Sequence, residues 1–335
     1  MRTFYYLLLL LFLPEIAGAQ QPDAPLYRDP IYDGAADPIV IWNRAERNWW
    51  MLYSARRSNQ PLPDVAFCYA TNIGVASSND HGKTWIYRGE LDLEFERGRN
   101  TFWAPDVIYH KGKYHMFVVY YQGARNHWGG HPAIHHYTSK NMWDWKHIGP
   151  LKLSSDRVID ATLFKMKDGK FRMWYKDETR GANTMMSESK DLYKWTTNSD
   201  KVTIGGEAHE GPKVFEFKGY YWMLTDEWHG MRVYCSKDLD NWEKQGLVLD
   251  KPSSRKEDTP SGAHGDVVVV NDKAYIFYFT HPGRKTHFEG ELDADGGYSY
   301  SNRRSSIQVA ELVFDGKTLT CDRDKPFDFY LPDLD

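Results

Sequence analysis

One stretch decides the fold: His209-Glu-Gly-Pro-Lys-Val-Phe-Glu-Phe-Lys-Gly-Tyr-Tyr-Trp-Met-Leu224. An acidic residue and a Gly-Pro pair stand before a short apolar strand, a Lys-Gly turn follows, and an aromatic run opens a second strand. A glycine-containing turn between strands rich in aromatic and β-branched residues is typical of a β-hairpin. The stretch therefore predicts a hairpin with a carboxylate at its open end.

The same unit recurs at four other places in the chain. Counting back from an aromatic residue early in the second strand gives one common position, which the five copies fill with Asp37, Trp103, Asp160, Glu210 and His264. The steps between these positions are between 50 and 66 residues. A period near fifty with about four strands per unit is typical of a β-propeller. We therefore predict an all-β fold, a five-bladed β-propeller that forms a single domain.

The later part of each unit supplies its third and fourth strands. The octet Ser78-Asn-Asp-His-Gly-Lys-Thr-Trp85 fits the Asp-box, a turn in which the Asp ties a hairpin and the Trp packs beneath it. Three other units replace it with a Ser-Lys turn that leads to Trp145, Trp195 or Trp242. These turns indicate structure and carry no chemistry of their own.

Composition excludes some classes of partner. The 335 residues carry a net charge of −4, so there is no basic field for nucleic acid or anionic lipid. Aromatic residues make up 15% of the chain, which suits both strands and sugar-stacking surfaces. The cysteines Cys68, Cys235 and Cys321 are too few for a disulfide framework or a metal cluster, and we expect buried thiols.

Residues 1–19 read as a secretory signal peptide. Arg2 precedes an apolar core from Phe4 to Leu13, and Ala17-Gly-Ala19 provides a small-residue cleavage site. No later apolar run approaches the length of a membrane span, so we expect no membrane association. The prediction is an exported protein, periplasmic or extracellular, in which residues 20–335 form one catalytic propeller domain.

Three of the five repeated positions are carboxylates: Asp37, Asp160 and Glu210. In a propeller the first strand of each blade lines the central axis, so these side chains should meet in one depression. Clustered carboxylates raise one another's pKa, which is costly for stability and typical of functional sites. Glycosidic hydrolysis needs such a group, with one carboxyl protonated to release the leaving oxygen and one ionised to activate water. The alternative is that single Asp residues merely cap turns.

An ordered set of short motifs now points to a family. The blades begin with Asp37-Pro, Trp103-Ala-Pro-Asp106, Ile159-Asp-Ala-Thr-Leu-Phe, Glu210-Gly-Pro and a His-containing strand at His264. This order resembles glycoside hydrolase family 43 and its relatives, including families 117, 32 and 62. The resemblance spans nearly the whole mature chain and implies a five-bladed propeller glycosidase that inverts configuration. It implies that Asp37 is the general base, Glu210 the general acid and Asp160 the group that orients the acid and sets its pKa.

Two further residues follow from the resemblance. His209 stands next to Glu210, as in family 117 enzymes, where a His near this position is implicated as the acid; it is a second candidate for proton donor. His264 occupies a position at which family 43 members often place a His near a cation, which suggests a structural calcium ion. The reaction itself requires no cofactor.

Substrate-binding candidates lie at the strand mouths and in the loops. Trp103 is a candidate platform for a sugar ring, and Asp106, three residues deeper, either contacts substrate or ties down backbone. The loops, which usually carry specificity, add Arg57 with its neighbour Arg56, and Trp128, Arg180, Trp228 and Arg304. An Arg there would bind sugar hydroxyls or the carboxylate of an acidic sugar.

The predicted partner is therefore an oligosaccharide or polysaccharide. The resemblance and the bulky loops after Tyr121 and Thr280 imply exo-acting release of terminal arabinofuranosyl, xylosyl or galactosyl residues from plant or algal fragments. One alternative is a family 117-like hydrolase of anhydrogalactose-terminated oligosaccharides. An alternative from another class is a sugar-binding propeller without catalysis, and the oligomeric state stays open.

Overall fold

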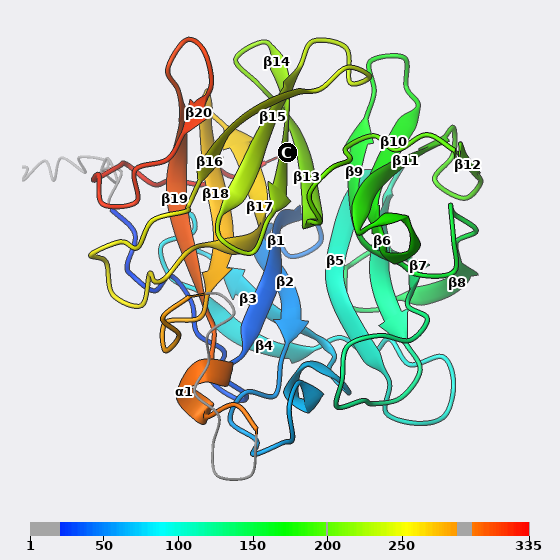
Figure 1. Ribbon diagram of the computed structural model, residues 1–335, viewed down its shortest axis with the longest axis horizontal. Coiled ribbons are helices and arrows are strands. Elements are labelled where there is room, and N and C mark those ends of the chain that lie inside the picture. Colours follow the sequence, from blue (N-terminus) through cyan, green and yellow to red (C-terminus); the bar gives the residue numbers. More distant parts are fainter. Residues whose placement is uncertain (1–20, 199, 287–296, 335) are drawn as a thin grey trace, which may run out of the picture.

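The computed structural model describes residues 21–198, 200–286 and 297–334. Within these residues the chain forms five antiparallel sheets of four strands each, and every sheet uses strands that are consecutive in sequence. The predicted signal peptide, residues 1–19, lies outside the described residues. The repeat count of five is confirmed, and the fold is an all-β, single-domain, five-bladed propeller (Figure 1).

The blades follow one another along the chain. Blade 1 consists of β1 (Ala35–Asn43), β2 (Asn48–Ala55), β3 (Ile73–Ser78) and β4 (Ile86–Glu90). Blade 2 consists of β5 (Thr101–His110), β6 (Lys113–Tyr121), β7 (Ala133–Ser139) and β8 (Lys146–Pro150). Blade 3 consists of β9 (Val158–Lys165), β10 (Phe171–Asp177), β11 (Asn183–Ser189) and β12 (Trp195–Thr197).

The remaining blades complete the ring. Blade 4 consists of β13 (Glu210–Phe217), β14 (Tyr220–Asp226), β15 (Met231–Ser236) and β16 (Glu243–Val248). Blade 5 consists of β17 (Ala263–Val270), β18 (Lys273–Thr280), β19 (Ser306–Phe314) and β20 (Leu319–Thr320). Among the described residues the helices are short: η1 (Ala66–Cys68), η2 (Glu178–Arg180) and α1 (Tyr300–Arg303). None of them is long and apolar enough to span a membrane.

The first strand of each blade lies at the centre. β1 contacts β5, β5 contacts β9, β9 contacts β13, β13 contacts β17, and β17 contacts β1 again. This closed cycle of inner strands is the geometry that the sequence analysis required for bringing distant residues together.

The second strands show why the blades need one another. Side chains alternate between the two faces of a strand, and on β2 the alternate residues Trp50 and Leu52 pack with blade 2. The residues between them, Met51 and Tyr53, pack instead with blade 5. Burying one such side chain stabilises the fold by about 1.5–3 kcal/mol. Because both faces of the second strand are covered by neighbouring blades, its sequence is almost continuously apolar.

The two ends of the chain fasten the ring between blades 5 and 1. Tyr27, before the first strand, exchanges two backbone hydrogen bonds with Ile307 of β19. Near the C-terminus, the Leu331 N–H donates to the His81 carbonyl at 2.9 Å, and the Trp49 indole donates to the Pro332 carbonyl at 2.9 Å. Segments from both ends thus join the last blade to the first.

The predicted Asp-box is present. Asp80 accepts from Ser78 Oγ and from the Thr84 N–H, and the Trp85 indole donates to the Gly82 carbonyl. The Ser-Lys turns of blades 2, 3 and 4 use the same type of bond, in which a Ser hydroxyl faces an Asn or Asp two residues later. The three cysteines, all in the described part of the chain, are free thiols, and Cys68 is fully buried.

A group of charges lies on the propeller axis below the strand mouths; we call Asp106, Lys213 and Asp266 the axial cluster. Lys213 Nζ lies 2.6 Å from Asp266 Oδ1 and 3.2 Å from Asp106 Oδ1. The second oxygens of these carboxylates accept backbone N–H groups, from Val40 at 2.8 Å and from Leu163 at 2.6 Å. Since these five residues belong to five different inner strands, the cluster connects every blade.

Candidate active site

Each inner strand interrupts its pairing with the second strand at the same level. The unpaired residues begin at Asp37, Ala104, Asp160, Gly211 and His264. The first four have positive φ angles, between 43° and 57°. Such β-bulges bend a strand and redirect its side chains, and non-glycine residues at these angles concentrate at functional sites. The bulges therefore mark the level at which the inner strands present side chains to the axis.

The predicted common position is wrong by one residue in two blades. Asp37, Asp160 and His264 begin their bulges, whereas Trp103 and Glu210 come one residue before theirs. The aromatic residues used for counting do not stand at equal distances from their turns, because Tyr114 and Tyr221 are second after the turn and Tyr275 is third. The error did not matter for the site, since all five predicted residues line one pocket.

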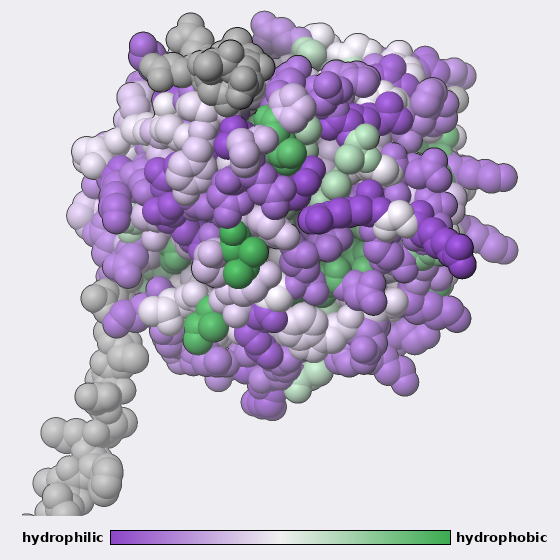
Figure 2. All heavy atoms as spheres, turned by 90° about the horizontal axis from the view of Figure 1, so that it is seen from below, coloured by the Kyte–Doolittle hydropathy of each residue, from purple (hydrophilic) through white to green (hydrophobic). Residues whose placement is uncertain are grey.

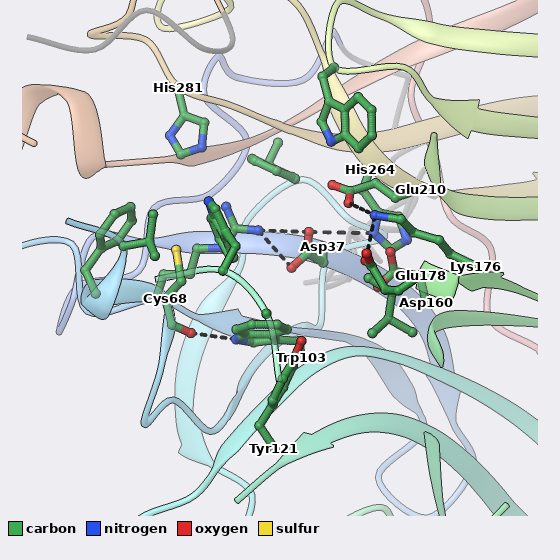
Figure 3. A pocket seen from close by; sticks show the side chains of 18 of the residues that line it. Asp37, Cys68, Trp103, Tyr121, Asp160, Lys176, Glu178, Glu210, His264 and His281 are labelled. Atoms are coloured by element: carbon green, nitrogen blue, oxygen red, sulfur yellow. Dashed lines mark hydrogen bonds and ion pairs between the residues drawn. The ribbon is translucent and has the colours of Figure 1, made fainter. Parts of the chain in front are cut away.

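The pocket lies at the centre of the ring and has a volume of about 370 Å³. Asp37, Asp160 and Glu210 meet there from blades 1, 3 and 4 (Figure 3). The geometric prediction on which the sequence analysis depended is therefore confirmed.

A second ring of pocket residues comes from the ends of the second strands. In each blade, the last inner-strand residue before the bulge pairs with a residue of the second strand. The residue two positions further along the second strand lines the pocket in all five blades: Arg56, Tyr121, Glu178, Trp228 and His281. Sequence analysis proposed Trp228, and Arg56 together with its neighbour Arg57, but missed the other three. Counting to the same position on the second strand of each hairpin would have identified them.

Asp37 is buried and held on two sides. Ser54 Oγ donates to its Oδ2 at 2.8 Å, and Arg56 donates to both oxygens at 3.2 Å. His264 Nδ1 lies 3.7 Å from Asp37 Oδ1. These contacts fix the orientation of the carboxylate at the pocket floor.

Glu210 faces a lysine that sequence analysis did not find. Lys176 Nζ lies 3.1 Å from Glu210 Oε2 and 2.9 Å from Glu178 Oε1 (Figure 3). The Lys176 ammonium also lies over the Trp228 ring. Burial alone would raise the pKa of Glu210, but the Lys176 charge, together with the Trp228 hydrogen bond and the His264 charge, outweighs burial and lowers that pKa. Lys176 therefore favours the ionised form of Glu210 in the free protein.

The pKa of Asp160 is shifted in the opposite direction, upward. Its Oδ2 accepts the Gly211 N–H at 3.2 Å. Burial, with the negative charges of Glu210 and Asp37, raises the pKa of Asp160 more strongly than His264 and Lys176 lower it. Interacting carboxyls of this kind titrate as a group. Below about pH 7 the free protein therefore favours a proton on Asp160 beside an ionised Glu210.

A further carboxyl supports the site from behind. Asp226 is fully buried, and its oxygens accept the His264 N–H at 2.8 Å and the Trp228 N–H at 2.7 Å. Burial and the Glu210 charge raise its pKa to about 7. Asp226 thus joins the end of blade 4 to the start of blade 5, which positions His264 and Trp228.

Aromatic side chains form another wall. Trp103 donates its indole N–H to the Cys68 carbonyl and packs edge-on against Tyr69 and Tyr121. Trp128, 62% exposed, lines the pocket from the β6–β7 loop with its ring centre 6.2 Å from that of Trp103. A rigid aromatic wall with an exposed tip suits the apolar face of a sugar ring.

The structure places His209 outside the residues described as lining the pocket. Its Nδ1 donates to the Glu207 carbonyl at 2.9 Å, so its Nε2 accepts from Thr184 Oγ1 at 2.8 Å. Burial lowers the pKa of this histidine. His209 therefore has both ring nitrogens engaged away from Glu210, and nothing in this geometry gives it the role of proton donor.

Four proposed substrate-binding residues also lie outside the pocket-lining set of the described chain. Asp106 belongs to the axial cluster. Arg57 donates to the carbonyls of Tyr69 and Ala66 and so holds the η1 loop, while its neighbour Arg56 faces the pocket. Arg180 is exposed on η2, and Arg304 forms ion pairs with Asp33 and Glu257.

The surroundings of His264 do not fit a calcium ion held by protein ligands. Within the described residues no group of three or more His, Cys, Asp and Glu side chains is arranged to hold a metal. Calcium requires about six to eight oxygen ligands, whereas Asp37, whose Oδ1 lies 3.7 Å from His264 Nδ1, is already paired with Arg56. The His264 ring also packs against Gly211, where an added Cβ would lie 2.4 Å from His264 Cγ.

The end of the molecule that carries α1 has a mainly hydrophilic surface (Figure 2). Apolar side chains appear there in small separate groups rather than as one broad patch. Such a surface suits a polar ligand better than an extended apolar partner.

Comparison with known proteins agrees with this geometry. The model of glycosyl hydrolases family 43 matches residues 66–317. A thermostable family-43 glycoside hydrolase has a similar fold, with a TM-score of 0.64 at 19% identity over 92% of this chain and 98% of the other. A β-xylosidase/α-arabinofuranosidase of this family from a compost microbial metagenome, solved with xylotriose in a calcium-free form, gives 0.64 at 17% over 91% and 97%. A β-1,3-galactosidase solved with galactodeoxynojirimycin gives 0.64 at 15% over 93% and 100%.

Proposed function

Because this chain belongs to glycosyl hydrolases family 43 and is a glycoside hydrolase, we propose that its axial pocket releases terminal sugars with inversion of configuration. The observation that carries the proposal is the meeting of Asp37, Asp160 and Glu210 in one pocket. Inverting glycosidases use two carboxyl groups on opposite sides of the scissile bond, one as acid and one as base. Hydrolysis by this family needs no cofactor.

Each carboxyl has a role in the proposal. Asp37, oriented by Arg56 and Ser54, removes a proton from the attacking water. Glu210 protonates the leaving oxygen, and Asp160 supplies the buried proton that the coupled pair holds in the free protein. Lys176 stays bound to Glu178 when Glu210 becomes neutral, so its charge keeps a partner throughout the cycle.

Exo-action is supported by the size and walls of the pocket. Its volume of about 370 Å³ lies near the lower end of the range of about 300–1,000 Å³ typical of small-ligand sites. Trp128 and Gly129 line one side, and Arg284 and Tyr298 line another. A pocket bounded in this way accepts the end of a glycan chain rather than its middle.

The sugars named for similar structures guide the choice of substrate. They include a β-xylosidase/α-arabinofuranosidase and a β-1,3-galactosidase, so terminal arabinofuranosyl, xylosyl and galactosyl groups of plant or algal fragments are the first candidates. The anhydrogalactose alternative depended on His209 as acid, and that residue faces away from the pocket. We also propose that residues 1–19 direct export, which N-terminal sequencing of the mature protein tests.

A panel of aryl glycosides and oligosaccharides, assayed with wild type, Glu210→Gln and Asp37→Asn, tests the proposal. We expect hydrolysis by wild type, with the inverted anomer as the first product seen by NMR, and a loss of about 1,000-fold or more in each variant. Wild-type rates in both variants would show that the roles are wrong. Binding of sugars by wild type without cleavage of any would favour the non-catalytic alternative.

A further inference from the structure

Arg157 lines the pocket beside the catalytic carboxyls, immediately before β9 and three residues before Asp160. Its backbone is held on both sides: its N–H donates to Ser155 Oγ at 3.1 Å, and its carbonyl accepts from the Glu178 N–H at 2.9 Å. The next residue, Val158, donates to the Pro132 carbonyl at 3.2 Å. Arg157 is therefore a fixed part of the wall between blades 2 and 3.

The long cationic side chains of the pocket differ in what they contact. Arg56 and Lys176 each lie against carboxylates, and Arg284 donates through its Nε to a backbone carbonyl. The Nε of Arg157 is buried without a hydrogen-bond partner among the described residues. No carboxylate of the described chain lies within ion-pair distance of its guanidinium. Arg157 thus contributes a positive charge to the pocket without a matching protein anion in that part of the structure.

An unpaired buried donor destabilises a protein, so its retention beside a pocket points to a ligand that satisfies it. The guanidinium has a planar fork of donors that matches two oxygens of a carboxylate or a sulfate ester. A sugar hydroxyl satisfies one donor and leaves the charge unmatched. The donor chemistry therefore favours an anionic substituent over a neutral one.

The neighbouring side chains suit a sugar as the carrier of that substituent. The Arg157 charge acts on the hydroxyl of Tyr121, whose pKa is raised by burial and partly restored by this charge. Tyr121 packs against Trp103, and Trp128 lies beside Trp103 in the same wall. The other cations described above already contact carboxylates or a backbone carbonyl of the protein. The Arg157 guanidinium is therefore the favoured position in the pocket for an anionic group of the substrate.

We propose that the terminal sugar carries a carboxylate or a sulfate ester, and that Arg157 recognises this anion while the ring stacks on the aromatic wall. The inference rests on the proposed function and specifies its substrate class. Arg157 acts in this account as a specificity residue.

Binding of matched disaccharides to the Glu210→Gln protein tests the inference by calorimetry. The probes are galactose-terminated and glucose-terminated disaccharides and the counterparts whose C6 is a carboxylate or carries a sulfate ester. We expect the anionic forms to bind at least about 10-fold more tightly, and Arg157→Gln to reduce this preference by about 10- to 100-fold. Arg157→Lys should keep part of it, and Arg180→Gln, which changes an exposed Arg outside the pocket, should keep all of it.

Separate results decide the two proposals. Equal binding of neutral and anionic forms, a preference that survives Arg157→Gln, or no binding of any form would overturn the inference. A preference for only the carboxylate probes, or for only the sulfate-ester probes, would support the inference and identify the anion. Failure of wild type to cleave any bound disaccharide would remove the proposed function without changing the measured preference.

Discussion

Two charged groups lie on the inner strands, one at the strand mouths and the other two or three residues further along, and they are built differently. In the axial cluster an ammonium lies between Asp106 and Asp266, and both carboxylates also accept backbone N–H groups. In the pocket, the carboxyls Asp37, Asp160 and Glu210 crowd together, and burial and the negative charges of the other two raise the pKa of Asp160.

The difference indicates what each group does. Charges that are matched by a cation and by main-chain donors from other blades hold the ring together, even though burying them is costly. Charges that repel one another are retained at a cost in stability because their protonation can change during a reaction. Residue type does not distinguish the two groups, since both use aspartates of the inner strands.

Lys213→Met should have the largest effect on stability. It leaves Asp106 and Asp266 buried beside each other without their cation, and removing one partner of a buried ion pair typically costs about 3–5 kcal/mol. Denaturant unfolding measures this loss. Lys218→Met, which removes an exposed ion pair in the turn of blade 4, is the matched control and should change stability by less than about 1 kcal/mol. Equal effects of the two variants would contradict a structural role for the axial cluster.

Asp160→Asn should change stability in the opposite direction while abolishing activity. The pKa of Asp160 is raised from 3.8 to about 7, so between these pH values the unfolded chain releases a proton that the folded protein keeps. Wild-type stability therefore falls as pH rises through this window. The variant lacks this penalty and should be more stable than wild type by about 1–3 kcal/mol at pH 8. At pH 3.5 the two proteins should unfold at nearly the same denaturant concentration.

Unfolding curves at the two pH values check the sign. A variant that is less stable than wild type at pH 8 would show that Asp160 is a structural carboxylate like those of the axial cluster.

Lys176→Met should have a smaller effect, visible in the pH dependence of kcat/KM. The lysine lowers the pKa of Glu210, so its removal raises that pKa and keeps the acid protonated to higher pH. The alkaline limb of the profile should move upward by about one pH unit or more, which corresponds to about 1.4 kcal/mol. An unchanged limb in an active variant would mean that Lys176 does not control the protonation of Glu210.

A chelator should have the smallest effect. The axial cluster contains its own cation in Lys213, and the residues around His264 do not fit a calcium ion. Overnight treatment with EDTA followed by gel filtration should leave activity and the thermal midpoint unchanged within error. Recovery of lost activity on adding calcium would show that a metal contributes after all.

The sequence was sufficient to predict the parts of the molecule that repeat. Five hairpins with turn glycines and aromatic strands at a steady period imply a propeller, because blades of this kind bury their faces only against neighbours. The mouths of the first strands then converge on the axis, which located Asp37, Asp160 and Glu210.

The missed and misplaced residues depend on strand pairing, which a single sequence does not define. Side chains alternate between faces, so an error of one residue exchanges a pocket residue for a packing residue. Arg57 was chosen where Arg56 faces the pocket, and His209 was considered where only Glu210 does. Lys176 and Glu178 were missed because their position follows from pairing with β9 across a turn longer than those of blades 2, 4 and 5.

One measurement compares the two groups directly: kcat/KM of Asp37→Asn and Asp106→Asn on the best substrate of the panel. Both changes replace a buried carboxylate on the same axis by an amide of nearly equal shape. The account predicts a loss of about 1,000-fold or more for Asp37→Asn and a change of less than about 10-fold for Asp106→Asn, since Asp106 does not line the pocket. Comparable losses in both variants, or full activity in Asp37→Asn, would contradict it.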